Sequence, residues 1–318
     1  MFFSLRHACR AFLVIGFAAG LFNKPETLVA KVPLLQVIPQ PDGQLSLERD
    51  GVELARYHYG RQARRPFLFP LRGPSGHGLT RLGHPHDPYG HRHHLSVWIS
   101  HHDVDGVDFW SDTGAGRIVH QRVDRIVDGE DECSFSVTNH WIAGEREVLL
   151  VERRVIRLDA LPDGEWRLIL DLTLTAPNHP VKLGKTPFGP LGVRVAKTMG
   201  VRDGGGTIRN SAGGVNESGV FWKPARWVDY SGPVSNTLSE GITLMDHPDN
   251  PNHPSIFHVR DDGWMGPSLT FNGPRTIAPH SPLHLRYALY IHRGIPQPPQ
   301  LEAQWKEFAK LKPPALEK

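Results

Sequence analysis

The sequence has 318 residues, with 36 lysine and arginine residues against 33 aspartate and glutamate residues, and it is long enough to bury a sizeable core. Most of the small positive excess lies within the first thirty residues. The remainder is close to neutral, which excludes a strong electrostatic attraction to nucleic acid or to an anionic membrane. Cys133 is the one cysteine beyond those thirty residues, which excludes an internal disulfide in that part of the chain.

The first thirty residues have the pattern of a secretory signal peptide. Arg6 and Arg10 give a basic start, and an apolar run over 11–22 precedes a short polar stretch that ends at Ala30. This run is shorter than the roughly 20 residues that a transmembrane helix needs, and charged residues, histidines or prolines interrupt every later one. We therefore expect cleavage after Ala30, or earlier near residues 18–20. The mature protein would be exported, periplasmic or secreted, and would have no membrane span.

Beyond residue 30, strand patterns recur between glycine, proline and Asp-Gly turns. The segment 95–100 alternates aliphatic residues with Ser96, Trp98 and Ser100, and four leucines alternate along 166–175. No repeat or linker divides 31–318, so we predict one all-β domain, a large, supersandwich-like antiparallel β-sandwich, with a barrel as the alternative. The other predicted strands are 44–49, 52–59, 66–72, 107–110, 118–123, 134–142, 148–158, 191–196, 220–222, 256–260 and 283–291.

One helix is predicted, close to the C-terminus. Leu301, Trp305 and Phe308 are spaced i, i+4, i+7, with prolines at 298–299 before them and at 313–314 after them. We expect this helix to pack its apolar stripe against the sheet.

Histidines are concentrated between His77 and His102, where eight of the 19 occur. In an extended chain residues i and i+2 point the same way, so His84 with His86, and His91 with His93, form pairs that could converge on one divalent transition metal. Asp87 or Asp103 could complete such a site. The spacing matches no standard metal motif, so a metal-free polar active site and a structural hydrogen-bond network remain alternatives. The candidate catalytic residues of this segment are His84, His86, Asp87, His93 and His94.

Further candidate residues lie outside that segment. Glu217, in the glycine-rich stretch 213–219, is a candidate general acid or base, and a solvated loop charge is the alternative. Aromatic faces with neighbouring polar groups suit a sugar ring, although strand alternation would bury part of such a set. The candidate substrate-binding residues are Trp98, Trp222, Trp227, Asp229, Tyr230, His253 and His258.

Five stretches of the chain resemble the PmoA-like family of bacterial proteins: 65–76, 83–110, 116–121, 214–233 and 245–264. The resemblance covers nearly all of the chain after the leader. It implies an exported, β-rich protein of a family often encoded near sugar-processing enzymes, and it therefore favours carbohydrate chemistry. The family label refers to a methane oxygenase subunit that is an integral membrane protein. Because no later apolar run could span a membrane, the label does not support that reaction here.

We therefore expect an enzyme that acts on a carbohydrate or glycoside by hydrolysis, elimination or isomerisation, with a small molecule or an oligosaccharide as substrate. A non-catalytic sugar-binding module is the alternative. A metal-dependent oxygenase is a second alternative, supported only by the family label and the histidines. Sequence motifs for binding ATP or NAD and for serine hydrolases are absent.

Overall fold

The computed structural model describes residues 31–83 and 88–312, together with Met1. Met1–Val32 and Pro33–Lys318 are separate units. The first is described only at Met1, Lys31 and Val32, so the predicted signal peptide lies outside the described residues and stays a prediction. No helix among the described residues is long and apolar enough to cross a membrane.

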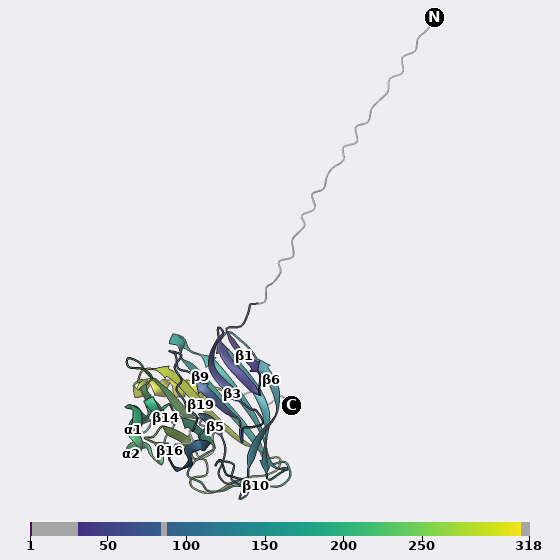
Figure 1. Cartoon of the computed structure of the whole chain (residues 1–318), viewed down its shortest axis with the longest axis vertical. Coiled ribbons are helices and arrows are strands. Elements are labelled where there is room, and N and C mark those ends of the chain that lie inside the picture. Colours follow the sequence, from purple (N-terminus) through teal and green to yellow (C-terminus); the bar gives the residue numbers. More distant parts are fainter. Residues whose placement is uncertain (2–30, 84–87, 313–318) are drawn as a thin grey trace. The chain divides into compact units, whose positions relative to one another are not determined.

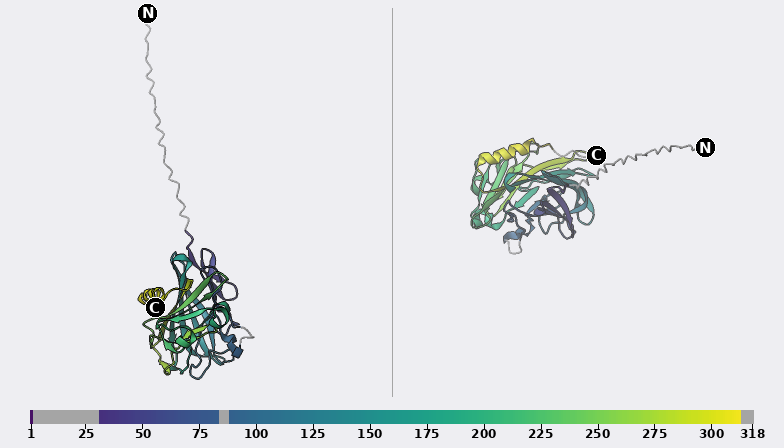
Figure 2. Two further views of the ribbon diagram at one scale, coloured as in Figure 1. Left: turned by 90° about the vertical axis from the view of Figure 1, so that its left-hand side faces the viewer. Right: turned by 90° about the horizontal axis from the view of Figure 1, so that it is seen from above.

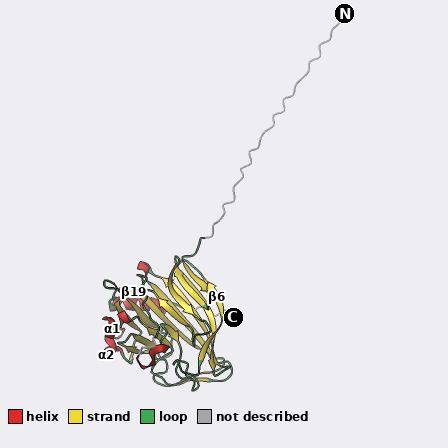
Figure 3. Cartoon of the chain, viewed as in Figure 1, coloured by secondary structure: helices red, strands yellow, loops and turns green. Residues whose placement is uncertain are grey.

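The strands of the second unit form two large antiparallel sheets, shown as arrows in Figure 1 and in yellow in Figure 3. In spatial order, the nine-stranded sheet consists of β1 (Leu35–Gln40), β2 (Gln44–Arg49), β3 (Val52–His58), β4 (Phe67–Leu71), β5 (Val97–Ile99), β11 (Leu191–Arg194), β17 (Trp264–Pro267), β16 (Ile256–Arg260) and β13 (Lys223–Pro224).

The eight-stranded sheet consists, in spatial order, of β12 (Thr207–Asn210), β14 (Trp227–Pro233), β15 (Ser239–Asp246), β19 (Leu283–Arg293), β9 (Trp166–Thr175), β8 (Glu147–Ala160), β7 (Glu132–Ala143) and β6 (Arg117–Val127). A third, small sheet pairs β10 (Val181–Leu183) with β18 (Arg275–Ile277).

The core lies between the two large sheets. Leu168, Leu170 and their alternating neighbours on β9 face it and are no more than 1% exposed. Tyr57 of β3 meets Phe135 of β7 across the interface, with ring centroids 5.1 Å apart. Cys133 is also buried here, as a free thiol. Two facing sheets confirm the predicted β-sandwich, and the barrel alternative does not apply.

The predicted C-terminal helix is confirmed as α3 (Pro298–Lys310), which Figure 2 draws in yellow. Gln297 and Gln300 form a capping box where the helix begins. Leu301 and Phe308 are buried and Trp305 is half-buried, against residues that alternate with the sandwich core on β9, β14, β15 and β19. The helix therefore covers the outer face of the eight-stranded sheet.

The remaining helices are short: η1 (Pro88–His93), η2 (Pro162–Gly164), η3 (Lys197–Met199), α1 (Val201–Gly204) and α2 (Asn216–Val220). Two predicted strands are absent from the described residues. The segment 220–222 holds the end of α2 and a turn, and Val107 makes only an isolated bridge to Val104. Both are short apolar runs, for which sequence periodicity separates strand from other structure poorly.

Strand alternation decides what the outer face of the nine-stranded sheet carries. Val97, Val193 and Met265 point into the sandwich core. Their neighbours point the other way, so an aromatic and polar surface forms on the outer face of β5, β11, β16 and β17. It is built from Trp98, Gly192, Arg194, His258, Arg260 and Trp264.

Candidate functional site

Three tryptophans form an aromatic floor on this outer face. The ring centroids of Trp98 and Trp264 lie 5.3 Å apart, and Trp110 lies 5.3 Å from Trp98 and 5.6 Å from Trp264. Gly192, between the two strands that carry Trp98 and Trp264, leaves room for their rings, because a Cβ atom there would lie 2.6 Å from Trp98 and 2.7 Å from Trp264. The floor therefore depends on a residue without a side chain at the centre of the sheet.

His94 completes the floor. Its ring stacks on Trp98 and on Trp264, with centroids 5.1 Å away in each case, and it is buried. Burial, with the neighbouring His93 and Arg194, holds the pKa of His94 far below its ordinary value. His94 is thus a neutral aromatic surface, whereas the sequence predicted a catalytic group.

A cavity of about 530 Å³ lies over this floor, and we call it the tryptophan pocket. Its histidines come from η1 and from the segments that carry β5 and β16, and its charged groups come from α1, β16 and the turn after β16. The pocket is lined by His91, His93, His94, His102, Trp110, Ser111, Phe188, Arg202, His258, Arg260, Asp262 and Trp264.

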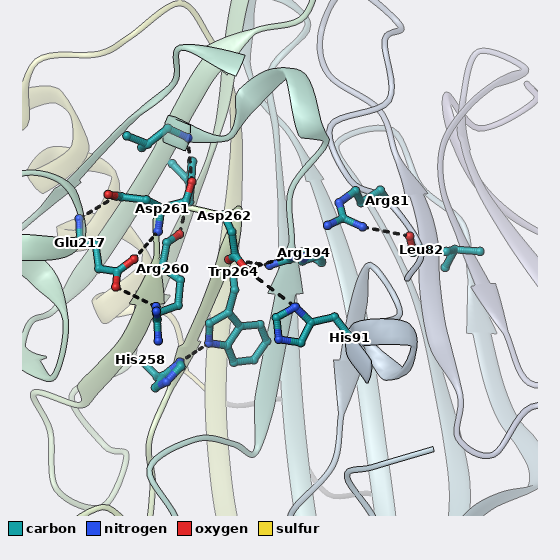
Figure 4. Close-up of polar contacts among 12 residues, drawn as sticks. Arg81, Leu82, His91, Arg194, Glu217, His258, Arg260, Asp261, Asp262 and Trp264 are labelled. Carbon is teal, nitrogen blue, oxygen red and sulfur yellow. Dashed lines mark hydrogen bonds and ion pairs between the residues drawn. The ribbon is translucent and has the colours of Figure 1, made fainter. Parts of the chain in front are cut away.

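His258, a predicted substrate-binding residue, lies in the pocket with its proton position fixed. The indole Nε1–H of Trp264 donates to His258 Nδ1, as Figure 4 shows. Because an indole N–H only donates, Nδ1 accepts, and the neutral ring carries its proton on Nε2. Burial and the charge of Arg260 lower the pKa of His258 to about 4. This histidine is therefore a neutral hydrogen-bond donor.

In His102 the two ring nitrogens have the opposite roles to those in His258. Its Nδ1 lies 3.2 Å from Asp108 Oδ1. Burial alone would raise the pKa of Asp108, but hydrogen bonds from the Ser111 hydroxyl and amide, the Trp110 amide and His102 outweigh it and lower that pKa. An ionised carboxylate only accepts, so Nδ1 of His102 donates and Nε2 of the neutral ring holds the lone pair. The sequence prediction missed this pair, although His102 is the last histidine of the histidine-rich segment and Asp108 follows six residues later.

Phe188 lies near both of these histidines. Its ring centroid lies 5.8 Å from that of His102 and 6.0 Å from that of His258. The pocket therefore holds an imidazole acceptor and an imidazole donor that are both near one aromatic ring.

The carboxylate of Asp262 forms an ion pair with Arg194. Arg194, which is 2% exposed, donates to both of its carboxylate oxygens, at 2.8 and 3.4 Å, and His91 Nδ1 lies 3.8 Å away. Burial alone would raise the pKa of Asp262, but Arg194 outweighs it and holds the pKa below its ordinary value. Asp262 therefore stays ionised and positions Arg194 and His91.

Glu217 is a positioning residue in this structure, whereas the sequence predicted a general acid or base. It lies in α2 and not in a loop, its carboxylate accepts from the Asp261 amide at 2.8 Å, and it lies 2.8 Å from Arg260 Nε. Figure 4 shows both contacts. Glu217 does not line the pocket; it holds Arg260, which does.

Trp222 lies at the edge of the pocket, with its ring centroid 6.2 Å from that of His258. It is 43% exposed, packs on Phe221 at 4.3 Å and on Phe271 at 5.5 Å, and has a φ of 55°. A positive φ is unusual for so large a residue, and such strain is concentrated at functional sites. The predicted role of Trp222 in binding substrate is compatible with this placement.

Two of the four proposed metal ligands, His91 and His93, lie among the described residues, and they do not have the extended conformation that the sequence suggested. His91 and His93 lie in η1, a 3₁₀ helix in which residues i and i+3 overlap, so His91 stacks on His94 with centroids 4.8 Å apart, while the His93 ring lies edge-on. Among the described residues, no three His, Cys, Asp or Glu side chains gather as a metal site would require. The other proposed ligands, His84 and His86, and the candidate Asp87 lie outside the described residues.

Four predicted substrate-binding residues lie away from the pocket. Trp227 is buried under α3 and donates to Glu302, and Asp229 is buried in a network with His292. Tyr230 is buried in the sandwich core, and His253 pairs with Asp246 at 2.8 Å beside α3. Both faces of β14 are covered, one by the core and the other in part by α3, which a sequence without packing information does not reveal. Trp98 belongs to the floor of the site, beneath the pocket.

Other cavities lie elsewhere. One, of about 310 Å³, is on the outer face of the eight-stranded sheet beside Asp171 and Arg286, and another, of about 890 Å³, lies beside Tyr59 and His120. We place the candidate site in the tryptophan pocket because it combines aromatic rings, an oriented carboxylate–imidazole pair and guanidinium groups.

Residues 44–306 match the model of a family of unknown function, DUF6807. The chain belongs to this family. The matched range includes β2 to β19, most of α3 and every residue of the tryptophan pocket, so the candidate site of this DUF6807 protein lies within the matched range. The PmoA-like resemblance stays a prediction.

None of the curated proteins is a significant sequence match to this DUF6807 chain. Among solved structures, it is similar to a heparan sulfate lyase HepC from Pedobacter heparinus, with 8% identity, a TM-score of 0.44 and coverage of 83% of this chain and 37% of that one. It is also similar to a 4-alpha-glucanotransferase from Thermococcus litoralis, with 12% identity, a TM-score of 0.31 and coverage of 82% and 40%. The chain thus spans about two fifths of the length of these structures.

Proposed function

We propose that this DUF6807 protein is an enzyme that acts on a carbohydrate by proton transfer in the tryptophan pocket. The observation that carries the proposal is the opposite arrangement of the two pocket histidines, His102 with its lone pair on Nε2 and His258 with its proton there. A base and a neutral hydrogen-bond donor that face one cavity suit removal of a proton from a substrate whose oxygen gains negative charge.

A carbohydrate fits the rest of the surface. Trp222 offers an exposed indole at the pocket edge, and Trp110 and Trp264 line the pocket. Apolar C–H faces of a sugar pack on such rings, while its hydroxyl groups bond to imidazole and guanidinium. The cavity volume of about 530 Å³ is also within the range of small-molecule sites.

The chemistry favours elimination or isomerisation over hydrolysis. Most glycoside hydrolases use a pair of carboxyl groups at the scissile bond. Among the described lining residues Asp262 is the one carboxylate, and Arg194 binds it. In an elimination, His102 would take a proton from carbon, a C=C bond would form, and the neighbouring C–O bond would break with its electron pair going to the leaving oxygen. That oxygen would then take a proton from protonated His102 or from water, which would pass on the proton taken by His102. His258 would stabilise charge on an oxygen of the substrate.

The test is turnover of a panel of neutral, amino and acidic oligosaccharides, followed by proton NMR. We expect the wild-type protein to convert at least one of them, and His102→Gln to lower kcat by about 10²- to 10⁴-fold, because general-base catalysis contributes that much. The matched control is His77→Gln, which changes an exposed histidine outside the pocket.

Full turnover by His102→Gln would contradict the assigned role of the base. A wild-type protein that binds a sugar in the pocket but converts none would instead indicate a sugar-binding module. Circular dichroism of each variant checks that the fold is intact.

A further inference from the structure

The tryptophan pocket carries an excess of positive charge. Its described lining residues include two guanidinium groups, those of Arg202 and Arg260, and one carboxylate, that of Asp262, which pairs with Arg194 outside the lining. Asp262 and Arg194 neutralise one another. His94 and His258 have lowered pKa values, so both are neutral at pH 7 and add no charge. Arg202 and Arg260 therefore decide the sign of the charge that a ligand meets.

Arg260 is held in place with part of its guanidinium free for a ligand. Glu217 lies 2.8 Å from its Nε, and its Cζ lies 5.2 Å above the Phe221 ring. The side chain nevertheless remains 44% exposed. A carboxylate on one edge and an aromatic ring below fix the plane of the group, and such a planar fork binds carboxylate or sulfate oxygens in a defined geometry.

Arg202 offers the second positive charge. It lies on α1 and lines the same pocket, and its side chain is exposed. Its amide donates to the Asp261 carbonyl, which joins α1 to the turn after β16 that also carries Asp262. Its guanidinium has no ion pair or hydrogen bond among the described residues. Two arginines, one from α1 and one from β16, therefore flank the pocket, and the charge of one of them is unmatched.

We propose that the saccharide bound by this pocket is acidic, and that Arg202 and Arg260 bind its carboxylate or sulfate group. The proposal rests on the proposed function, because it names the substrate class of the same site. It also gives Glu217 a role: by holding Arg260, Glu217 positions the group that binds the anion.

The test compares three matched oligosaccharides by calorimetric titration: a neutral hexose trisaccharide, its uronic acid counterpart and its sulfated counterpart. We expect one of the two acidic ligands to bind about 10- to 100-fold more tightly than the neutral one, as charge-assisted hydrogen bonds would give. Which of them binds distinguishes a carboxylate from a sulfate. The preference should shrink in about 0.5 M salt, where charges are screened over about 4 Å.

Two variants complete the test. Arg202→Gln should lose most of the preference for the acidic ligand while it still binds the neutral one. Arg146→Gln, which removes an exposed charge at the β7–β8 turn, should behave like the wild type.

Equal binding of neutral and acidic ligands, or a preference that Arg202→Gln leaves intact, would overturn this inference while the proposed function stands. A protein that binds none of the three, nor any member of the turnover panel, would overturn both.

Discussion

His94, His102 and His258 line one cavity, and their partners give each a different state. His94 is a neutral stacking surface because two indoles enclose it. Asp108 orients His102 as an acceptor, and Trp264 orients His258 as a donor. A ring nitrogen's role is decided by what the other nitrogen bonds to. Sequence alone can locate a histidine-rich segment, but it does not give these roles, because Trp264 and His258 lie more than 150 residues beyond His94.

Glu217 and Trp222 illustrate the same limit within a few residues of each other. Both were candidates in the sequence, and both lie near the pocket. The carboxylate of Glu217 forms an ion pair with Arg260 and accepts a hydrogen bond from the Asp261 amide, whereas the Trp222 ring remains exposed. Only the partners that the fold supplies distinguish a positioning residue from one available to a ligand.

At the scale of elements, β11 is the strand that the site depends on most. Replacing Gly192 by alanine would place a Cβ atom 2.6 Å from Trp98 and 2.7 Å from Trp264, both in a packed layer. We expect Gly192→Ala to lower the free energy of unfolding by about 1–3 kcal/mol, as overpacking does, and to weaken binding in the pocket. Urea denaturation measures the first effect.

Gly78→Ala is the control for that substitution, because a Cβ atom at Gly78 meets nothing within 4 Å. It should leave both stability and binding nearly unchanged. If Gly192→Ala were as stable as the wild type, the floor would not be packed as described.

The elements differ in how well the sequence predicts them. Alternation along β9 and the i, i+4, i+7 spacing of α3 record burial on one face, so both were predicted from local pattern. The segment around η1 was expected to be extended, but it forms a 3₁₀ helix. The sequence did not predict this helix, because the polar histidines of the segment show no periodic pattern of burial. The burial of Trp227 and Asp229 depends on contacts with Glu302 of α3 and His292 of β19, which the sequence of their own strand does not reveal.

At the scale of the whole molecule, buried neutral histidines should make stability depend on pH. Burial lowers the pKa of His101 and of His258 to about 4, and that of His94 further. The unfolded chain, with histidine pKa values near 6.5, binds protons first, so stability present above about pH 6.5 is lost as the pH falls toward 4. We expect a loss of about 1–2 kcal/mol for each such histidine between pH 7 and pH 5.

Asp171 acts in the opposite direction, since burial raises its pKa to about 6 against the opposing charge of Arg286. It is one group, whereas burial also lowers the pKa values of His58, His120, His140 and His247, in the same direction as those of the three histidines above. Urea denaturation at pH 7 and pH 5 measures the sum. His101→Gln, which changes a buried histidine that does not line the pocket, should reduce the dependence. A free energy of unfolding that is constant, or that rises on acidification, would show that these rings are not neutral in the folded protein.

The central claim is that the pocket holds one histidine as an acceptor and another as a donor. The most direct test is nitrogen–proton NMR correlation of the imidazole rings, with His102→Gln and His258→Gln spectra for assignment. The account predicts that His258 carries a single proton, on Nε2, down to pH 5, since its pKa is about 4. It also predicts that neutral His102 carries its proton on Nδ1. A His258 protonated on Nδ1, or a neutral His102 protonated on Nε2, would contradict the account.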